Sequence, residues 1–441
     1  MRYYALIAGG GTAGHALPAL RLAEELAKRQ PDKKIGLIGG RRGLERKLWS
    51  PSAFDSYYLP GRGIPRIAGR PSLAGVMKYS LEMAYFGIDQ LGAILKSLKL
   101  ISLKRPSVVV VFGGYSAIAP ALVGVSMRIP LVVVNVDAIA GGSNRILSRF
   151  ARAVAVAWPG TGLAREQVTG IPVSSGIVET GCARRMILGS PSGNGGMPSG
   201  QDGQRWLPER WSGEGGQEMA KGLREAEELR RSAREALGLP EDRVVILAAG
   251  GSLGARRLNE LVMDLSSIWA ERSDLAVYHI AGERFLQESS EYARRLGLQS
   301  SDNTQHDGHN EQGGGIYYRQ VGYESRMDKA YLAADFAICR AGAVTVGELA
   351  VAALPALLIP LPGAPSRHQE ANAAVLTSIG AAVMVEEKDT TAAKLAETLE
   401  RIVGDRERLE KMSAAYPDLD NGYGTSRLAD LVERYVKRSD D

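Results

Sequence analysis

The chain has 441 residues, 45% of them hydrophobic and 23% charged, which is the profile of a globular protein with two or three domains. Its formal net charge of +5 suits anionic ligands or an anionic membrane surface, but is equally compatible with an ordinary basic protein. The two isolated cysteines, Cys182 and Cys339, argue against a disulfide framework and against a zinc site. With no leader and no run of about 18 apolar residues, we expect a cytoplasmic protein.

The first 180 residues alternate short apolar runs with helical patterns. Successive residues in these runs are all apolar instead of alternating between apolar and polar, which is typical of strands in a parallel sheet that is covered on both faces. We therefore predict a doubly wound α/β domain over residues 1–180. Strands are expected at 4–8, 34–39, 108–112 and 130–136, and a helix at 16–29 with Pro18 in its first turn.

The second half of the chain repeats this organisation after a change in composition. A Gly-rich insert and a charged helical stretch form a predicted linker over 183–235, and a second α/β domain is expected over 236–415. The last segment, 416–441, contains an amphipathic helix that we expect to pack back on the N-terminal domain. The two Gly-rich inserts are 189–216 and 300–315, the charged helix is 217–237, and the second domain opens with strand, glycine turn and helix at 243–260.

Three glycine loops follow predicted strands, at 9–14, 112–120 and 248–255. The first satisfies G-x-G-x-x-G, but the second strand ends in Gly-Gly-Arg-Arg at 39–42, without the acidic residue that a nicotinamide ribose requires. Arginines there leave an NADP-dependent oxidoreductase as an alternative. Loops of small residues at helix N-termini bind any diphosphate. Three of them predict a cleft between two sheets that holds two diphosphate ligands.

Four motifs, in this order, resemble the MurG family: GGGTAGHALPAL, FGGYSAIAP, GGSLGARRLN, and CRAGAVTVGELA with RHQEANA downstream. The resemblance spans almost the whole chain apart from the two inserts. It implies the GT-B fold, in which two Rossmann-like doubly wound parallel-sheet domains face a cleft. It also implies inverting transfer of N-acetylglucosamine from UDP-GlcNAc to undecaprenyl-pyrophosphoryl-MurNAc-pentapeptide in peptidoglycan synthesis, without a cofactor or a metal.

The resemblance further implies roles for residues that match the family's motifs. Glu348 would accept hydrogen bonds from both ribose hydroxyls of the donor, and Gln369 would contact its sugar. The full set expected to bind the donor is Thr12, Ala13, Gly14, Asp137, Ser174, Ser252, Glu324, Ala343, Val344, Thr345, Val346, Gly347, Glu348 and Gln369. The set expected to bind the acceptor is Gly11, His15, Gly113, Gly114 and Tyr115.

Three positions depart from the family's pattern: Asp137 replaces an asparagine, Ser174 an arginine, and His368 a glutamine. Attack of an acceptor hydroxyl on the anomeric carbon needs a base within about 3 Å. His15 is the first candidate because an imidazole titrates near working pH, and Asp137 is the second. Alternatively, His15 caps its helix or binds phosphate, and Asp137 is the N-cap of a helix that starts near Ile139.

Other charged residues have simpler interpretations beside the functional one. Glu348 could be an exposed helix residue, and Arg340 could be structural or could face a phosphate. His306 and His309 lie in a polar insert, where we expect them to be solvated rather than to bind a metal.

A lipid-linked acceptor requires contact with a membrane. Residues 73–100 have a helical pattern with exposed-looking Met, Tyr and Phe, and Arg62, Arg66 and Arg70 lie just upstream. Apolar surface with basic charge predicts a peripheral membrane patch around 62–100, on the inner face of the cell membrane; an ordinary core helix is the alternative. No nucleic-acid partner is expected. The remaining alternatives for function are another GT-B glycosyltransferase with a different acceptor and a nucleotide-sugar-binding protein without turnover.

Overall fold

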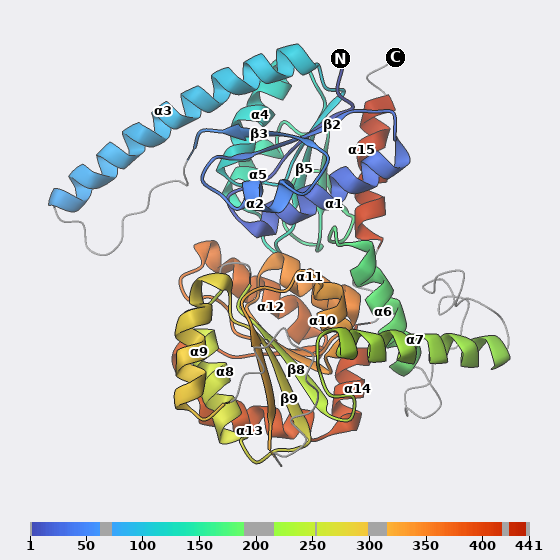
Figure 1. Ribbon diagram of the computed structural model, residues 1–441. Helices are drawn as coiled ribbons and strands as arrows, with labels where there is room; N and C mark the ends of the chain where they lie inside the picture. Colours follow the sequence, from blue (N-terminus) through green and yellow to red (C-terminus); the bar gives the residue numbers. More distant parts are fainter. Residues whose placement is uncertain are drawn as a thin grey trace. The chain divides into compact units, whose positions relative to one another are not determined.

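The computed structural model describes residues 2–61, 73–188, 216–251, 254–298, 315–416 and 423–437. The chain forms two compact units: Met1–Val173 with Gly422–Asp441, and Ser174–Asn421. Each unit is built around one parallel β-sheet flanked by helices (Figure 1).

The sheet of the first unit has seven parallel strands in the order β3-β2-β1-β4-β5-β6-β7. Its central strands are continuous apolar runs with every residue buried, because helices cover both faces. The predicted strands are confirmed to within a residue or two, whereas β3, β6 and β7, which are short or polar, were not predicted. The strands are β1 (Ala5–Ala8), β2 (Ile35–Gly40), β3 (Asp55–Leu59), β4 (Val108–Val111), β5 (Leu131–Asn135), β6 (Ala153–Val156) and β7 (Glu166–Val168).

Six helices accompany this sheet in the described residues. They are α1 (Ala13–Arg29), α2 (Glu45–Trp49), α3 (Leu73–Lys104), α4 (Tyr115–Ser126), α5 (Gly142–Leu147) and α15 (Gly424–Lys437). The first of them begins three residues earlier than expected, so Pro18 lies in its second turn rather than its first. The last comes from the far end of the chain and packs on α1, where Arg29 pairs with Asp430 at 2.6 Å and with Glu433 at 3.2 Å.

The sheet of the second unit has six parallel strands in the order β10-β9-β8-β11-β12-β13. They are β8 (Val244–Ala249), β9 (Leu275–Ile280), β10 (Tyr317–Val321), β11 (Phe336–Cys339), β12 (Ala356–Leu358) and β13 (Ala382–Met384). The helices of this unit are α6 (Ser175–Leu188), α7 (Gly216–Ala236), α8 (Arg256–Ile268), α9 (Leu286–Arg295), α10 (Met327–Ala333), α11 (Ala343–Ala352), α12 (His368–Ser378), α13 (Ala392–Val403) and α14 (Arg406–Ala414), with short 3-10 turns η3 (Glu283–Phe285), η4 (Pro365–Arg367) and η5 (Glu387–Asp389).

The boundary between the units differs from the expected one. It falls between Val173 and Ser174 instead of at residue 180. The predicted linker over 183–235 contains α7 and the end of α6, and these two helices pack against each other and against α10. On α7 the face that carries Ala226 and Ala233 is buried, since a charged helix with one apolar stripe gains stability by packing that stripe on a neighbour.

The two predicted inserts lie almost wholly outside the described residues, as do His306, His309, Arg62, Arg66 and Arg70. Among the helices that are described, none is both long enough and apolar enough to cross a membrane.

Candidate functional site

Two glycine loops of the first unit meet at the carboxyl ends of the adjacent strands β1 and β4. Gly114 adopts φ 77°, and a Cβ atom there would overlap the carbonyl oxygen of Gly10. Gly11 adopts φ 94°, and its Cβ would lie 3.3 Å from the ring of Tyr115. The two loops therefore touch each other, and only glycine allows this approach at residue 114. The first turns of α1 and α4 begin here, so their free N–H groups favour an anion at this edge.

Glu45 holds the first glycine loop by hydrogen bonds, and this role was not predicted from the sequence. Its carboxylate is fully buried and accepts hydrogen bonds from the backbone N–H groups of Gly11 and Gly40. The other carboxylate oxygen has no hydrogen-bond partner among the described residues. Burial of a carboxylate is energetically unfavourable unless the group is hydrogen-bonded. Here the two hydrogen bonds fix the position of the first glycine loop. Its only sequence signal is its place shortly after Gly39-Gly40, at the end of β2.

His15 lies in the first turn of α1, half-buried, after the N-cap residue Thr12. Its Nδ1 atom is 3.4 Å from the Thr12 hydroxyl oxygen. A Cβ atom on Gly114 would be 3.6 Å from the same Nδ1. The structure thus brings together His15, both glycine loops and Tyr115. Burial, and then the nearby Glu45, raise the pKa of the Tyr115 phenol.

Asp137 lies in the loop after β5, and it is not a helix cap. The helix that follows begins at Gly142 with Gly141 as its N-cap. Asn135 holds the loop by donating to the Asp137 carbonyl oxygen at 2.7 Å, and Asn144 donates to Asn135 Oδ1 at 3.0 Å. Because Asn144 also lies beside Gly113, this amide network places the Asp137 loop next to the second glycine loop.

In the second unit, the expected nucleoside-binding residues begin α11 at the carboxyl end of β11. Glu348 is half-buried on this helix, and the hydroxyl of Tyr331 donates to its Oε2 at 2.9 Å. Burial and then the Glu348 charge raise the pKa of Tyr331 well above its usual value, so this phenol stays a donor. Glu348 is therefore a positioned carboxylate rather than a free surface residue. Tyr331 was missed because it precedes Glu348 by 17 residues in another helix.

Glu324 follows β10 at the same edge, and its carboxylate is already engaged. It accepts from the Tyr278 hydroxyl at 2.7 Å and from the Arg326 backbone N–H at 2.8 Å. Burial alone would raise its pKa, but these bonds and the Arg326 guanidinium lower the pKa of Glu324 below its usual value. The Glu324 side chain thus holds the turn after β10 in place. Because this carboxylate is engaged, backbone groups of the turn are the ones available to contact a ligand.

Two further residues lie beyond β11 and β12. Gln369 accepts from the Leu361 backbone N–H at 2.9 Å, which attaches α12 to the loop after β12. Arg340 donates to the Ile359 carbonyl oxygen at 3.1 Å and pairs with Glu387. These contacts support the structural interpretation of Arg340, and its Nε atom is buried without a hydrogen-bond partner among the described residues.

Ser252 lies outside the described residues. Ser174 belongs to the second unit, where its carbonyl oxygen accepts from the first turn of α6. In the part of the chain that is described, no three His, Cys, Asp or Glu side chains gather in a way that could hold a metal ion.

The comparisons with known proteins cover both units. The Glycosyltransferase family 28 N-terminal domain matches residues 5–156, and the Glycosyltransferase family 28 C-terminal domain matches residues 245–435. A relative from Nocardioides sp., named UDP-N-acetylglucosamine--N-acetylmuramyl-(pentapeptide) pyrophosphoryl-undecaprenol N-acetylglucosamine transferase, is 33% identical over 432 residues, 97% of this chain and 96% of the relative. One of the same name from Rhodococcus erythropolis is 30% identical over 438 residues, 97% of this chain and 93% of the relative. The chain belongs to the MurG family.

Solved structures share the fold of this MurG-family chain. MurG from Acinetobacter baumannii is 24% identical with a TM-score of 0.65, covering 98% of this chain and 100% of that one. UDP-GlcNAc 2-epimerase from Neisseria meningitidis is 12% identical with a TM-score of 0.55, covering 98% and 100%. The predicted family and the GT-B fold class, with two parallel-sheet α/β domains, are confirmed.

Proposed function

We propose that the chain is an inverting hexosyltransferase that moves N-acetylglucosamine from UDP-GlcNAc to undecaprenyl-pyrophosphoryl-MurNAc-pentapeptide. The observation that carries the proposal is the match of a relative of that name along 97% of the chain. Both sheets also present glycine turns and helix N-termini at their carboxyl ends, where α/β folds bind phosphates. The product would be the disaccharide precursor of peptidoglycan, so the enzyme would act in cell-wall biogenesis and thereby in cell shape and division.

The donor would bind to the second unit. Glu348, with one oxygen held by Tyr331, suits a vicinal diol such as the ribose hydroxyls, because a carboxylate accepts two hydrogen bonds side by side. The backbone after Gly322 would meet the uracil, and the first turn of α11, from Ala343, would face the phosphates. Ser252, Ser174 and Gln369 remain further donor contacts in this proposal.

The acceptor would bind to the first unit, with its pyrophosphate at Gly113, Gly114 and Tyr115. An acceptor hydroxyl oxygen attacks the anomeric carbon while the bond from that carbon to the UDP oxygen breaks, with inversion. The hydroxyl proton passes to a base, for which His15 is the first candidate and Asp137 the second. The electron pair leaves on UDP, and helix N-termini with loop N–H groups stabilise that charge, so the chemistry requires no metal.

The membrane contact would be made by α3 in the first unit. Its outer face exposes large apolar side chains, and Lys96 and Lys99 are exposed beside them. Apolar area with basic charge favours binding to an anionic bilayer surface. We propose that the protein lies peripherally on the inner face of the cell membrane, where its lipid-linked acceptor would be found.

Turnover tests the proposal directly. The full chain is incubated with UDP-GlcNAc and a short-chain analogue of the lipid-linked acceptor, and UDP release and the disaccharide product are measured with and without a chelator. We expect product in both cases. Tight UDP binding without turnover on this acceptor would favour a nucleotide-sugar-binding protein, and turnover only on a different acceptor would favour another GT-B enzyme. Binding of NADP but not of UDP-GlcNAc, measured by calorimetry, would favour the oxidoreductase.

A further inference from the structure

A polar cavity lies within the second unit, away from the residues expected to bind the donor. Its volume is about 480 Å³, and it is bordered by α6, α7 and α14. Val244 and Asp335, which line it, stand at the beginnings of β8 and β11. The expected donor residues follow the carboxyl ends of the strands, so in this parallel sheet the cavity lies at the opposite, amino-terminal end of the strands.

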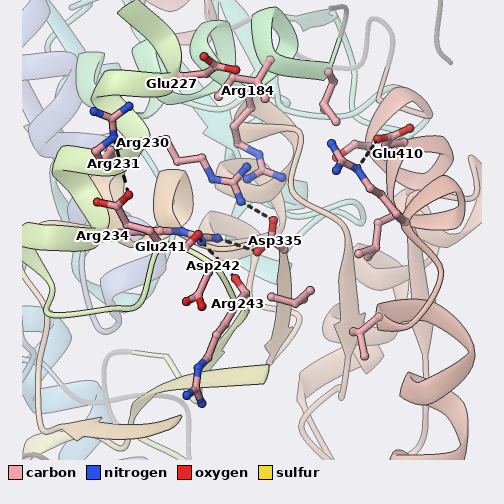
Figure 2. Close-up of a pocket in the computed structure, with 17 residues that line it drawn as sticks. Arg184, Glu227, Arg230, Arg231, Arg234, Glu241, Asp242, Arg243, Asp335 and Glu410 are labelled. Carbon is pink, nitrogen blue, oxygen red and sulfur yellow. Dashed lines mark hydrogen bonds and ion pairs between the residues drawn. The ribbon is translucent and has the colours of Figure 1, made fainter. Parts of the chain in front are cut away.

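Two arginines pair with one carboxylate in this cavity, and a third lies close to them. Arg230 pairs with one oxygen of Asp335, and Arg234 donates to the other at 2.8 Å (Figure 2). The Arg184 guanidinium lies beside that of Arg230 in the same group. The Val245 backbone N–H also donates to Asp335, at 2.8 Å. Both oxygens of the Asp335 carboxylate thus have partners. The three arginines outnumber this one carboxylate, so the cluster keeps an excess of positive charge.

The acidic residues around the opening do not remove this excess. Glu241 lies 3.8 Å from Arg231, and Glu410 lies 3.0 Å from Arg406, so each faces an arginine of its own. The other acidic side chains of the lining, Glu227 and Asp242, are exposed, where water screens them.

Two arginines of the cavity lining each carry a guanidinium donor without a protein partner in the described part of the chain. The Nε atoms of Arg184 and Arg230 are buried and have no hydrogen-bond partner among the described residues. Arg184 is only 6% exposed and uses its Nη1 to donate to the Ala334 carbonyl oxygen at 2.5 Å. A buried charged donor without an acceptor destabilises the protein, so an acceptor supplied by a ligand is favoured. Burial and the neighbouring Arg230 lower the pKa of Arg184 to about 9, which an added negative charge would counteract.

We propose that this cavity binds a small phosphate-type oxyanion, either inorganic phosphate or the phosphate group of a small metabolite. A guanidinium offers paired N–H donors whose spacing matches two oxygens of a phosphate, and two such groups with free Nε atoms lie side by side. The cavity is large enough for more than the phosphate group alone, since small-molecule sites fill about 300–1,000 Å³. The site is separate from the proposed donor and acceptor sites.

Calorimetric titration of the full chain tests this inference, with potassium phosphate and glycerol 3-phosphate as probes in the presence of saturating UDP. We expect saturable binding by the wild type, and a preference for one probe identifies free phosphate or a phosphomonoester. Arg230→Gln should weaken it at least roughly tenfold, since a charge-assisted pair is lost. The matched control Arg224→Gln, at an exposed position of the same helix outside the cavity lining, should change the affinity less than about twofold.

No saturable binding up to about 10 mM, or equal affinity in Arg230→Gln, would overturn the proposal. If Arg230→Gln does not fold, Arg184→Lys gives the same test, because it keeps the charge and removes the Nε donor. Amide hydrogen exchange on the wild type needs no variant. There phosphate should protect α6 and α7, and protection confined to the glycine loops would count against the site.

Discussion

At the scale of single residues, the functional groups depend on partners that hold them in place. Glu45 orders the first glycine loop, Tyr331 orients Glu348, and Asn135 fixes the loop of Asp137. Each partner is a buried polar group that would be costly without its hydrogen bond. A substitution of the partner should therefore affect activity, because the functional residue loses its fixed position even though it is itself unchanged.

Glu45→Ala should destabilise the first unit and lower turnover together. The substitution leaves the N–H groups of Gly11 and Gly40 without their acceptor, which costs about 1–3 kcal/mol for each buried group. Urea unfolding and initial rates measure the two effects. Glu45→Gln is the matched control, because it keeps the oxygen that both N–H groups use, and its turnover should stay closer to that of the wild type. Normal turnover by Glu45→Ala would show that the loop holds its position without this carboxylate.

Tyr331→Phe should raise the KM for the donor while leaving kcat nearly unchanged. The variant removes the bond to Glu348 Oε2, worth about 1 kcal/mol, so a rise of roughly threefold to tenfold is expected from steady-state kinetics. Tyr318→Phe serves as the control, because Tyr318 is also buried but bonds to His279 instead. An equal change in KM for both variants would mean that loss of stability, and not Glu348, is responsible.

His15→Ala and Asp137→Asn should separate the two candidate bases. Loss of a general base lowers kcat by about 100-fold to 10,000-fold, whereas loss of a binding contact acts mainly on KM. We expect the larger fall in kcat for His15→Ala, because His15 lies directly at the meeting point of the two glycine loops. Near-normal kcat in both variants would leave neither residue as the base.

At the scale of elements, α3 has two distinct faces. Ala93, Ser97 and Ile101 are buried, and the helix packs on α4 in this unit. On the other face the exposed apolar residues repeat every three or four positions, as on an amphipathic helix. They include Met77, Leu81, Ile88, Leu91, Leu95 and Leu98. The alternative of an ordinary core helix is therefore wrong for this outer face. Figure 1 shows that α3 extends beyond the sheet of its unit.

Ile88→Asp combined with Leu91→Asp should reduce binding to anionic vesicles without unfolding the protein. Both side chains are at least 60% exposed, so the cost in folding is small, whereas the lost apolar burial in a bilayer is worth about 1.5–3 kcal/mol for each side chain. Co-sedimentation with vesicles measures the effect, and Ile268→Asp on α8 is the exposed apolar control. Unchanged vesicle binding, together with a shift in sedimentation from dimer to monomer, would assign this face to a second copy of the chain instead.

At the scale of the whole molecule, six strands follow the same order in both units, the first unit adds β7, and the buried polar groups differ. The second unit contains His279, which is fully buried between the Tyr318 hydroxyl at 2.7 Å and Asn259 Oδ1 at 3.1 Å. Burial lowers the pKa of His279 to about 3. The folded chain therefore keeps this imidazole neutral at pH values where the unfolded chain protonates it.

Acid should consequently destabilise the second unit below about pH 6.5, the ordinary pKa of histidine. Between that pH and about 3 the unfolded state binds one proton more, so the free energy of unfolding falls by up to about 1.4 kcal/mol for each pH unit. Above pH 6.5 the residue contributes no pH dependence. Urea unfolding at pH 7 and pH 5 measures this, and His279→Gln should show a smaller decrease. An equal decrease in both proteins would place the acid sensitivity in other groups.

The local patterns of the sequence predict the central strands, the glycine loops and the family motifs. Continuous apolar runs such as VVVV at 108–111 and turns such as Gly113-Gly114 act over a few residues, so they can be recognised without knowing their neighbours. The edge strand β3 could not be recognised in this way. Its residues are polar and partly exposed, and pairing with β2 makes it a strand.

Contacts between distant segments were decided only by the tertiary structure. Glu45 bonds to a loop 34 residues earlier, and Arg184, Arg230 and Asp335 meet in one cavity. None of these contacts has a signature in the sequence, because the role of a buried charged residue depends on the residues that folding places next to it. The amino-acid order thus determined the two α/β folds and their phosphate-type loops, and the packing decided which polar groups hold those loops and which remain free for a ligand.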